Sequence, residues 1–378
     1  MDPNAKLTLR QRVQRMIRRR RVASPFVYLG VAAVLIGLLV VLKFVKLEKD
    51  APAYDGIAGT GVFTATFTGN INSVGDGLTA DSDDYAAFFD GVKDVFAKAD
   101  YVSVPINDPI LDDYVETYTS GMAIKFAEKY FNSELGLTLK ELGVKDATLS
   151  HKNILRYGSK GAIETAFTLE MKDIAISGLD PSSEADAAVT TEYYTDSGLK
   201  IIHMGIEASD NKMRDYTNYD IRTYNDKDNN IVRDVTVLRE QNPDAFIAVT
   251  VSWAENYLLK PSSYMKNLCH SLIDCGADVV IGTGVQMVLS AEEYGEGYIF
   301  YGLGNLVANE AYTMTQRGAL LNCIFDENGK VTYELVPLSV KGGTPKITGS
   351  KVILRTLVSD IGKNAEYRIE NGRLYITK

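Results

Sequence analysis

Cysteine, histidine and tryptophan are scarce in this chain, which has three Cys, three His and one Trp in 378 residues. The cysteines form no CxxC pair, and Cys269 and Cys275 lie six residues apart on one predicted helix. Their side chains would point to different faces, about 9 Å apart along the helix axis, which is too far for a disulfide. We therefore expect Cys269, Cys275 and Cys323 to be packing residues of the core.

The sequence also lacks repeats and low-complexity tracts, and it has a single long apolar run. It is 46% hydrophobic and long enough for one large domain or two ordinary ones, which excludes a disordered protein. The net charge is −9, but residues 1–24 carry eight Lys or Arg and one acid. The rest of the chain is therefore at about −16, which argues against binding nucleic acid or an anionic polymer through bulk charge.

The long apolar run, Phe26–Leu42, contains no charged side chain. The flanking Lys43 and Lys46 can extend toward the headgroups while their stems stay in apolar surroundings. Residues 25–45 are thus long enough to cross a hydrocarbon core roughly 30 Å thick as one helix. We predict an N-terminal transmembrane helix there, followed by a tether at residues 46–61.

The orientation of this helix follows from the basic cluster Arg18–Arg21. Positive charge favours the cytoplasmic side, so residues 1–24 are predicted to be a cytoplasmic tail and the main domain to be extracytoplasmic. A cleaved signal peptide is the alternative, with Ala51-Pro52-Ala53 as the small-residue site. The apolar run is longer than a usual signal-peptide core, and the charged residues 43–50 separate it from that site, so an uncleaved anchor is favoured.

Strand and helix patterns alternate beyond the tether, which predicts an α/β fold. The first part of this region has strand patterns at 62–71, 101–104, 147–149 and 174–177, helix patterns at 84–99, 114–131 and 160–172, and a hairpin pattern formed by 192–194 and 200–205. The polar segment 207–230 lacks periodicity and is predicted to be a surface loop. A strand at 246–252, a helix from Pro261 to Cys275 ended by Gly276, and strands at 278–281 and 298–307 follow.

This order of elements, together with the stretches GADVVIG (276–282) and FYGLGN (300–305), resembles the CapA family of capsule and poly-γ-glutamate synthesis proteins. The resemblance covers about residues 62–310. It implies a calcineurin-like metallophosphatase fold, which is a layered β-sandwich flanked by helices. We expect a CapA-like domain at 62–340 and a C-terminal β extension at 341–378, after the transmembrane helix.

The family's metal-binding motifs are altered at the positions where the resemblance places them. Amides, a hydroxyl or a glycine stand where the family has carboxylates and imidazoles, namely at Asn70, Asn107, Asn153, Ser252, Gly284 and Gln286. A dinuclear phosphatase needs carboxylates and imidazoles to hold two cations, and amides cannot hold two divalent ions in competition with water. We therefore expect no metal and no other cofactor in this domain.

The remaining polar residues give two weak catalytic candidates, His151 and Glu255. His151 lies at an expected strand end, but a lone His near a turn is more often structural. We predict a largely neutral binding cleft lined by Asn70, Asn107, Asn153, Ser252, Trp253, Gln286 and Asn305. We expect His203 to be satisfied within its apolar strand, and His270 to lie on a solvated helix face.

The sequence leaves three classes of function open. The favoured one is a non-catalytic binding or scaffold subunit on a single-pass anchor in a bacterial cell membrane. The family resemblance implies work in the synthesis or export of capsule, poly-γ-glutamate or another envelope polymer, with other membrane subunits as partners and no nucleic acid. The alternatives are a hydrolase or transferase with altered or metal-free chemistry using His151 and Glu255, and a purely structural envelope protein.

Overall fold

A computed structural model of the chain describes residues 29–37, 63–73, 85–111, 130–180, 190–208, 220–221, 223–224, 230–253, 257–362 and 366–377. The chain divides into two units, Met1–Leu47 and Glu48–Lys378. In the first unit, residues 29–37 are helical and exposed. No helix among the described residues is long and apolar enough to span a membrane. The predicted transmembrane segment, residues 25–45, extends beyond the described residues at both ends and stays a prediction.

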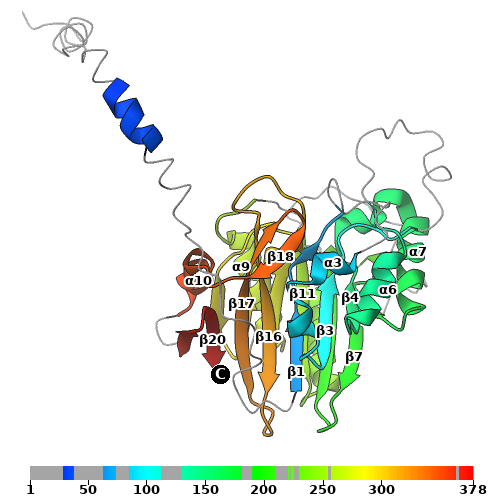
Figure 1. Cartoon of the computed structure of the whole chain (residues 1–378). Coiled ribbons are helices and arrows are strands. Elements are labelled where there is room, and N and C mark those ends of the chain that lie inside the picture. The colour runs from blue at the N-terminus through cyan, green and yellow to red at the C-terminus, as the bar shows by residue number, and fades with distance from the viewer. Residues whose placement is uncertain are drawn as a thin grey trace, which may run out of the picture. The chain divides into compact units, whose positions relative to one another are not determined.

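Two large sheets form the centre of the second unit (Figure 1). Within the described residues, the first sheet has nine strands in the order β19-β20-β17-β16-β1-β3-β4-β5, with β18 paired to β17. Its strands are β1 (Phe63–Phe67), β3 (Tyr101–Pro105), β4 (Asp146–Thr148), β5 (Ala175–Ser177), β16 (Arg317–Phe325), β17 (Val331–Lys341), β18 (Thr344–Ile347), β19 (Tyr367–Glu370) and β20 (Arg373–Thr377).

The second sheet has seven described strands in the order β10-β8-β11-β12-β14-β13, with β7 paired to β8. They are β7 (Thr190–Tyr194), β8 (Lys200–Ala208), β10 (Thr223–Tyr224), β11 (Phe246–Trp253), β12 (Val279–Thr283), β13 (Ala291–Tyr294) and β14 (Gly297–Phe300). Two short pairs complete the strands: β2 (Asn70–Ile71) with β15 (Asn305–Val307), and β6 (Leu179–Asp180) with β9 (Asp220–Ile221).

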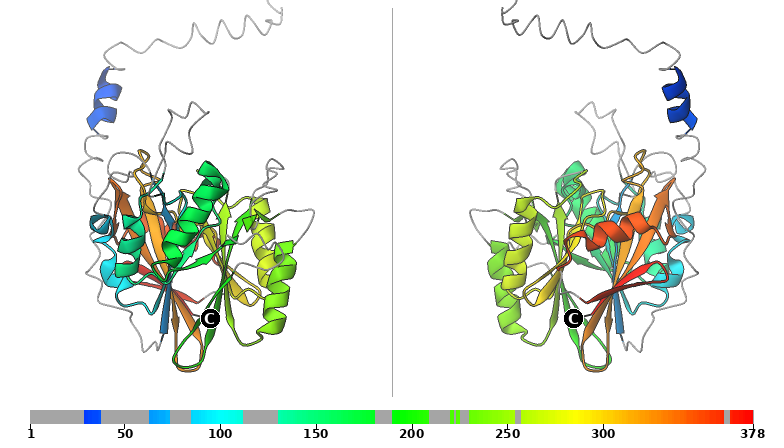
Figure 2. Two further views of the ribbon diagram at one scale, coloured as in Figure 1. Left: turned by 90° about the vertical axis from the view of Figure 1, so that its right-hand side faces the viewer. Right: turned by 90° about the vertical axis from the view of Figure 1, so that its left-hand side faces the viewer.

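Helices cover the outer faces of both sheets (Figure 2). The first sheet packs against α3 (Ala86–Phe89), α4 (Lys93–Phe96), α6 (Glu134–Glu141) and α7 (Gly158–Glu170), and the second against α8 (Asn230–Gln241) and α9 (Ser263–Asp274). The remaining helices are η1 (Lys152–Tyr157), α10 (Lys351–Leu357) and η2 (Val358–Asp360). The predicted class, an α/β sandwich flanked by helices, is what the structure shows.

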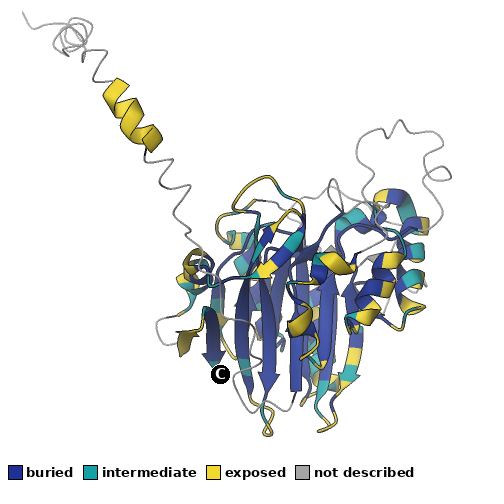
Figure 3. Cartoon of the chain, in the orientation of Figure 1, coloured by how far each residue is buried: buried dark blue, intermediate teal, exposed yellow. Residues whose placement is uncertain are grey.

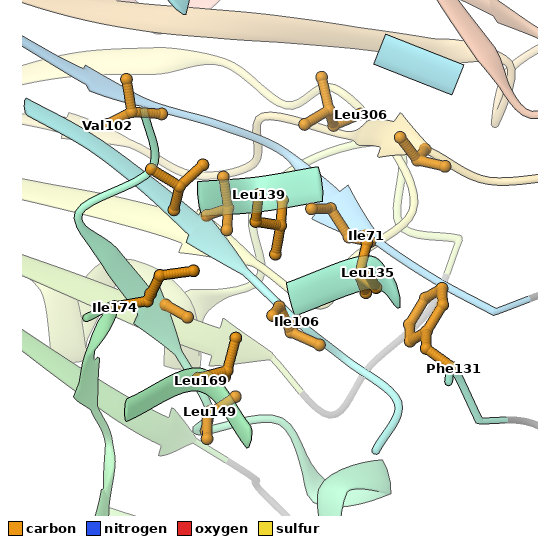
Figure 4. Close-up of a cluster of buried hydrophobic side chains, with 14 of the residues drawn as sticks. Ile71, Val102, Ile106, Phe131, Leu135, Leu139, Leu149, Leu169, Ile174 and Leu306 are labelled. Carbon is orange, nitrogen blue, oxygen red and sulfur yellow. The ribbon is translucent and has the colours of Figure 1, made fainter. Parts of the chain in front are cut away.

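Three buried hydrophobic clusters correspond to the three interfaces of these layers. One lies between the first sheet and its helices, where Leu135, Leu139 and Leu169 meet the strands (Figure 4). A second lies between the two sheets and includes Phe67 and Phe300, and a third lies under α8 and α9. Because most strands are buried on both faces, they appear as continuous buried ribbons (Figure 3).

The parallel strands fix where a site can form. In the first sheet β1, β3, β4 and β5 are mutually parallel, and in the second β8, β11, β12 and β14 are parallel. The carboxyl ends of parallel strands meet at one edge of their sheet, which is where ligands bind in open α/β sheets. The loops after β2, β3, β4, β11 and β12 are therefore the ones to inspect.

The helix predicted over 84–99 is two short helices, α3 and α4, with a turn at residues 90–92. Gly91 explains the break, because a Cβ there would collide with the Pro345 carbonyl of β18. Sequence periodicity also missed α6 and α8, the latter beginning where a polar loop was predicted to end. The helix predicted over 114–131 falls almost entirely outside the described residues.

The C-terminal segment 341–378 was predicted as a β extension, and β18, β19 and β20 do join the first sheet. It also contains a helix, α10, whose N-cap Ser350 accepts a hydrogen bond from the Ile353 amide. The hairpin of β7 and β8 is confirmed, as is the strand-helix-strand unit formed by β11, α9 and β12. All three cysteines are free; Cys269 and Cys323 are buried as expected, whereas Cys275 is only partly so.

Candidate functional site

A network of buried amides occupies the edge where the carboxyl ends of the strands meet. Asn70, just beyond β1, is its centre: its Oδ1 accepts a hydrogen bond from the Gly284 amide at 2.7 Å. Its Nδ2 donates to the Val285 carbonyl at 3.0 Å and to Asn305 Oδ1 at 3.1 Å. Both Asn70 and Asn305 are 0% exposed. Asn70 therefore ties the first sheet to the loop that follows β12 of the second.

Glycines make this close approach possible. Gly284 has φ +78°, a left-handed conformation, and a Cβ there would collide with the Trp253 carbonyl. A Cβ at Gly69 would lie 2.5 Å from the Gly304 carbonyl oxygen. Any larger residue at these positions would push the strand ends apart, since real Cβ atoms do not approach oxygen so closely.

The network continues from Asn305 toward the loop after β3. Asn72 donates through Nδ2 to Asn305 Oδ1 at 3.3 Å, and Asn107 donates through Nδ2 to Asn72 Oδ1 at 2.9 Å. Asn305 itself donates to the Thr315 carbonyl at 2.9 Å. Three predicted site residues, Asn70, Asn107 and Asn305, are thus linked by hydrogen bonds, and Asn72 is a member that sequence reasoning missed.

Asp108 is a second residue that the sequence analysis missed. Its carboxylate is 1% exposed and accepts from the Ser73 amide at 3.0 Å and from Asn153 Nδ2 at 3.1 Å. The Arg156 guanidinium lies 3.5 Å from the same carboxylate. The signal for Asp108 was its place directly after Asn107 at the end of a buried strand. Its role in the structure is to hold three loops together.

His151 is placed beside this cluster as the N-cap of η1. Its Nδ1 accepts from the Asn153 amide at 3.2 Å and lies 3.3 Å from the Asn107 carbonyl. The pKa of His151 is lowered to about 3, mainly by burial and also by the Lys152 and Arg156 charges, while the hydrogen bond with the Asn107 carbonyl opposes the shift. The imidazole is therefore neutral near pH 7, and its described contacts are those of a helix cap.

This depressed pKa predicts a pH dependence of stability. Below pH 6.5 the unfolded chain binds a proton at His151 that the folded chain rejects, so the free energy of unfolding falls by about 1.4 kcal/mol per pH unit from this residue. In His151→Asn that component should vanish, while stability at pH 7 stays within about 1 kcal/mol because Asn is also a good N-cap. Chemical denaturation at pH 7 and pH 5 checks this. An unchanged pH slope in the variant would contradict the assignment.

The other predicted site residues line the second-sheet side. Ser252 and Trp253 end β11, both are buried, and the Trp253 indole donates to the Tyr301 carbonyl at 3.0 Å. Ser252 Oγ and Gln286 Oε1 have no hydrogen-bond partner among the described residues. Glu255 lies outside the described residues. The residues that the sequence identified therefore lie at one edge of the fold, some on the first-sheet side and some on the second-sheet side.

The central amides are buried and do not line the open cleft that the sequence predicts. Asn70, Asn107 and Asn305 are between 0% and 2% exposed, and their hydrogen bonds are made largely with each other and with the backbone. Close glycine contacts join the strand ends at Gly69 and Gly284. Asn153 and Gln286 remain partly exposed, at the margin of the network.

Comparison with known sequences places this geometry in a family. The model of the bacterial capsule synthesis protein PGA_cap family matches residues 64–310. The chain belongs to this family. The match contains every described residue of the amide network except Thr315, as well as the parallel strands of both sheets apart from Phe63 of β1. The mixed α/β sandwich fits the metallophosphatase-like fold expected for PGA_cap proteins.

Two relatives of this PGA_cap protein come from Bacillus. The capsule biosynthesis protein CapA of Bacillus anthracis is 23% identical over 381 residues, covering 98% of this chain and 91% of that protein. The PGA biosynthesis protein CapA of Bacillus subtilis strain 168 is 25% identical over 332 residues, covering 83% and 82%. Among solved structures, TT1561 of Thermus thermophilus matches with TM-score 0.39 and 10% identity, covering 69% of this chain and 94% of that one.

The residues present do not fit the metal pair that a metallophosphatase fold implies. The family resemblance places a carboxylate ligand at Asn70, whose side-chain oxygen accepts a hydrogen bond from the Gly284 amide. Among the described residues, no group of three His, Cys, Asp or Glu is arranged to hold a metal ion. A neutral amide that is hydrogen bonded at both its ends supplies none of the negative charge that a carboxylate ligand gives to a pair of divalent cations.

Proposed function

We propose that this chain is a non-catalytic subunit of capsule or poly-γ-glutamate biosynthesis, acting as a scaffold or binding protein at the outer face of a bacterial membrane. Its membership of the PGA_cap family and its two CapA relatives support the role in capsule synthesis. In this proposal other membrane subunits of polymer synthesis, and the polymer itself, are its partners.

One observation carries the non-catalytic part of the proposal. The amide of Asn70 bonds to the Gly284 amide, the Val285 carbonyl and Asn305 at 2.7–3.1 Å, so the position of a metal ligand serves as a structural crosslink between the sheets. A phosphatase site must keep coordination positions open for substrate and water. At Asn70 both ends of the side chain are engaged in hydrogen bonds within the protein.

The alternative of altered chemistry draws no support from the described geometry. A histidine that acts as a general base needs a pKa near the working pH and a ring nitrogen that faces the reacting group. His151 is buried, its pKa is lowered to about 3, and its Nδ1 caps η1. A scaffold role needs none of these properties from His151.

The membrane location in this proposal rests on the sequence. The apolar run Phe26–Leu42 and the Arg18–Arg21 cluster support a single anchor with its N-terminus in the cytoplasm. The tether at 46–61 then leads to the domain outside. A domain held at this surface would meet an envelope polymer as it leaves the cell, so the topology suits the proposed partners.

A complementation experiment tests function and topology together. In a strain that lacks the gene for this chain, we expect capsular poly-γ-glutamate to be lost and to be restored by the chain carrying a reporter after Lys378. The reporter should be active only outside the cytoplasm. The His151→Asn chain should restore the polymer equally well, because the proposed role needs no catalysis.

Three outcomes would each remove a different part of the proposal. Polymer levels that do not depend on the gene would contradict the role in biosynthesis. A reporter active in the cytoplasm would contradict the orientation. A stably folded His151→Asn chain that restores no polymer would revive a catalytic role for His151.

A further inference from the structure

Large apolar side chains gather on the surface close to the amide network, on two loops and a helix. Tyr257 and Leu259 lie in the loop after β11, Tyr312 and Met314 in the loop after β15, and Val352 on α10. These five side chains, called the rim patch below, are between 42% and 68% exposed. The loop after β15 and α10 are visibly exposed at the surface of the sandwich (Figure 3).

The members of the rim patch are neighbours in space. The rings of Tyr257 and Tyr312 meet edge to face, with centroids 6.4 Å apart. Leu259 and Met314 line one small cavity together with Thr356 of α10. Val352 precedes Thr356 by four residues and so lies on the same side of the helix. Residues of the two loops and of α10 therefore lie together around this cavity.

The charge around the rim patch is opposite in sign to that of the domain. Lys260, Lys351 and Arg355 are exposed and lie in the same three segments as the apolar residues. Glu255 and Glu310 are the acids in those segments, so three cations against two acids leave a net charge of +1 there. The chain after residue 24 is strongly acidic, at about −16, so a basic and apolar surface here is not a consequence of average composition.

We infer that the rim patch docks on the anionic lipid surface of the membrane, an inference that rests on the proposed anchoring of the chain. Exposed tyrosine, leucine and methionine side chains beside lysine and arginine suit the lipid headgroup region. Burial of apolar area and electrostatic attraction to anionic lipids both contribute to the free energy of binding there. The cavity under the patch, about 50 Å³, is far smaller than the roughly 300 Å³ or more of a small-molecule site. A flat, deformable partner such as a lipid bilayer fits the rim patch better than a small molecule does.

The tether is long enough for this contact. Its 16 residues, 46–61, can span up to about 55 Å when extended. The first described strand starts at Phe63 and reaches the site edge at Asn70, a distance of about 25 Å. Asn305 holds the loop after β15 at that edge through the Thr315 carbonyl. A tethered patch also meets the bilayer at a high effective concentration, so weak contacts suffice.

The docking can be tested on the full chain in vesicles, where brominated lipids quench the fluorescence of a tryptophan that lies at the membrane. Tyr312→Trp places the reporter in the rim patch, and Phe167→Trp on α7 is the matched control, with parent side chains 68% and 61% exposed. The native Trp253 is 2% exposed and gives both variants the same background. Vesicles contain brominated lipid with either anionic or zwitterionic headgroups, and resistance to alkaline carbonate reports insertion of the anchor separately.

We expect strong quenching of the Tyr312→Trp indole in anionic vesicles, and little quenching in zwitterionic vesicles or with Phe167→Trp. Adding Lys351→Gln and Arg355→Gln to the Tyr312→Trp chain should lower the ratio of docked to free domain by roughly thirtyfold. This is the loss of membrane affinity expected when two cations near an anionic membrane are removed. Lys145→Gln with Lys160→Gln, the same change in charge at exposed positions elsewhere, should leave it unaltered.

The anchoring and the docking can fail separately. A carbonate-resistant chain whose Tyr312→Trp indole is not quenched in anionic vesicles would overturn the docking and leave the anchor intact. A chain extracted by carbonate would overturn the anchoring, and absence of quenching in that chain would overturn the docking as well. An indole shielded only when membrane subunits are reconstituted with the chain would assign the patch to a protein partner, against the inference.

Discussion

Replacing Asp146 by Ala is expected to lower the free energy of unfolding by about 3–5 kcal/mol. Asp146 on β4 and His203 on β8 are fully buried, and the His203 Nδ1 lies 2.8 Å from the Asp146 carboxylate. The Ser103 hydroxyl donates to the same oxygen at 2.6 Å. Removal of the carboxylate would leave His203 and Ser103 without this acceptor between the two sheets, where water cannot replace it.

A double-mutant cycle separates this link from general packing. Asp146→Ala combined with His203→Phe should cost less than the sum of the single changes, because the partner that was left unpaired is also removed. The exposed pair Lys140–Asp173 has nearly the same separation, 2.9 Å, and serves as control. Lys140→Ala should change stability little. Equal effects of Asp146→Ala and Lys140→Ala in chemical denaturation would contradict the intersheet link.

Replacing Asn70 by Leu should destabilise the fold by about 3 kcal/mol or more, since unsatisfied buried polar groups each cost about 1–3 kcal/mol. The variant leaves the Gly284 amide and the Val285 carbonyl without their partner and removes one donor from Asn305. Asn70→Asp, which introduces the carboxylate that the family resemblance implies at this position, should also destabilise the fold. The introduced carboxylate would still accept the hydrogen bond from the Gly284 amide. Its second oxygen would face the Val285 carbonyl and Asn305 Oδ1, which both lose the donor that the Asn70 amide provides.

The exposed Asn328 provides the matched substitution. Asn328→Asp in the turn after β16 should stay within about 0.5 kcal/mol of the parent protein. The Asn70→Asp chain should also gain no stability from added Mn²⁺, because the other family ligands are absent. Stabilisation of this variant by Mn²⁺ in thermal unfolding would show that the edge still holds a metal site.

The sequence predicted the elements whose patterns are local. Strand β11 is apolar along all but two of its eight residues and buried throughout, as a strand covered on both faces must be, and α9 has a clear N-cap at Ser262 and a stop at Gly276. The split of residues 84–99 into α3 and α4 was not predictable, because its cause is the contact of Gly91 with Pro345, more than 250 residues away.

The sequence predicted which residues gather at the candidate site. It did not predict that the central amides bond to one another instead of lining a cleft. Asn70, Asn107 and Asn305 stand at strand ends, and strand ends of parallel sheets converge, so their proximity follows from the sequence pattern. Whether they line a cleft or bond to each other depends on the separation of the strand ends, which Gly69 and Gly284 set. The link between Asp146 and His203 joins different sheets, and no sequence spacing indicates it.

The metal content of the purified full chain tests the central claim most directly. Cells supplied with manganese, iron and zinc should yield a chain with far less than one bound metal ion by elemental mass spectrometry, and the chain should not hydrolyse simple phosphodiesters, because hydrogen bonds within the protein occupy the Asn70 edge. Two bound metal ions per chain, accompanied by phosphodiester hydrolysis, would contradict the account.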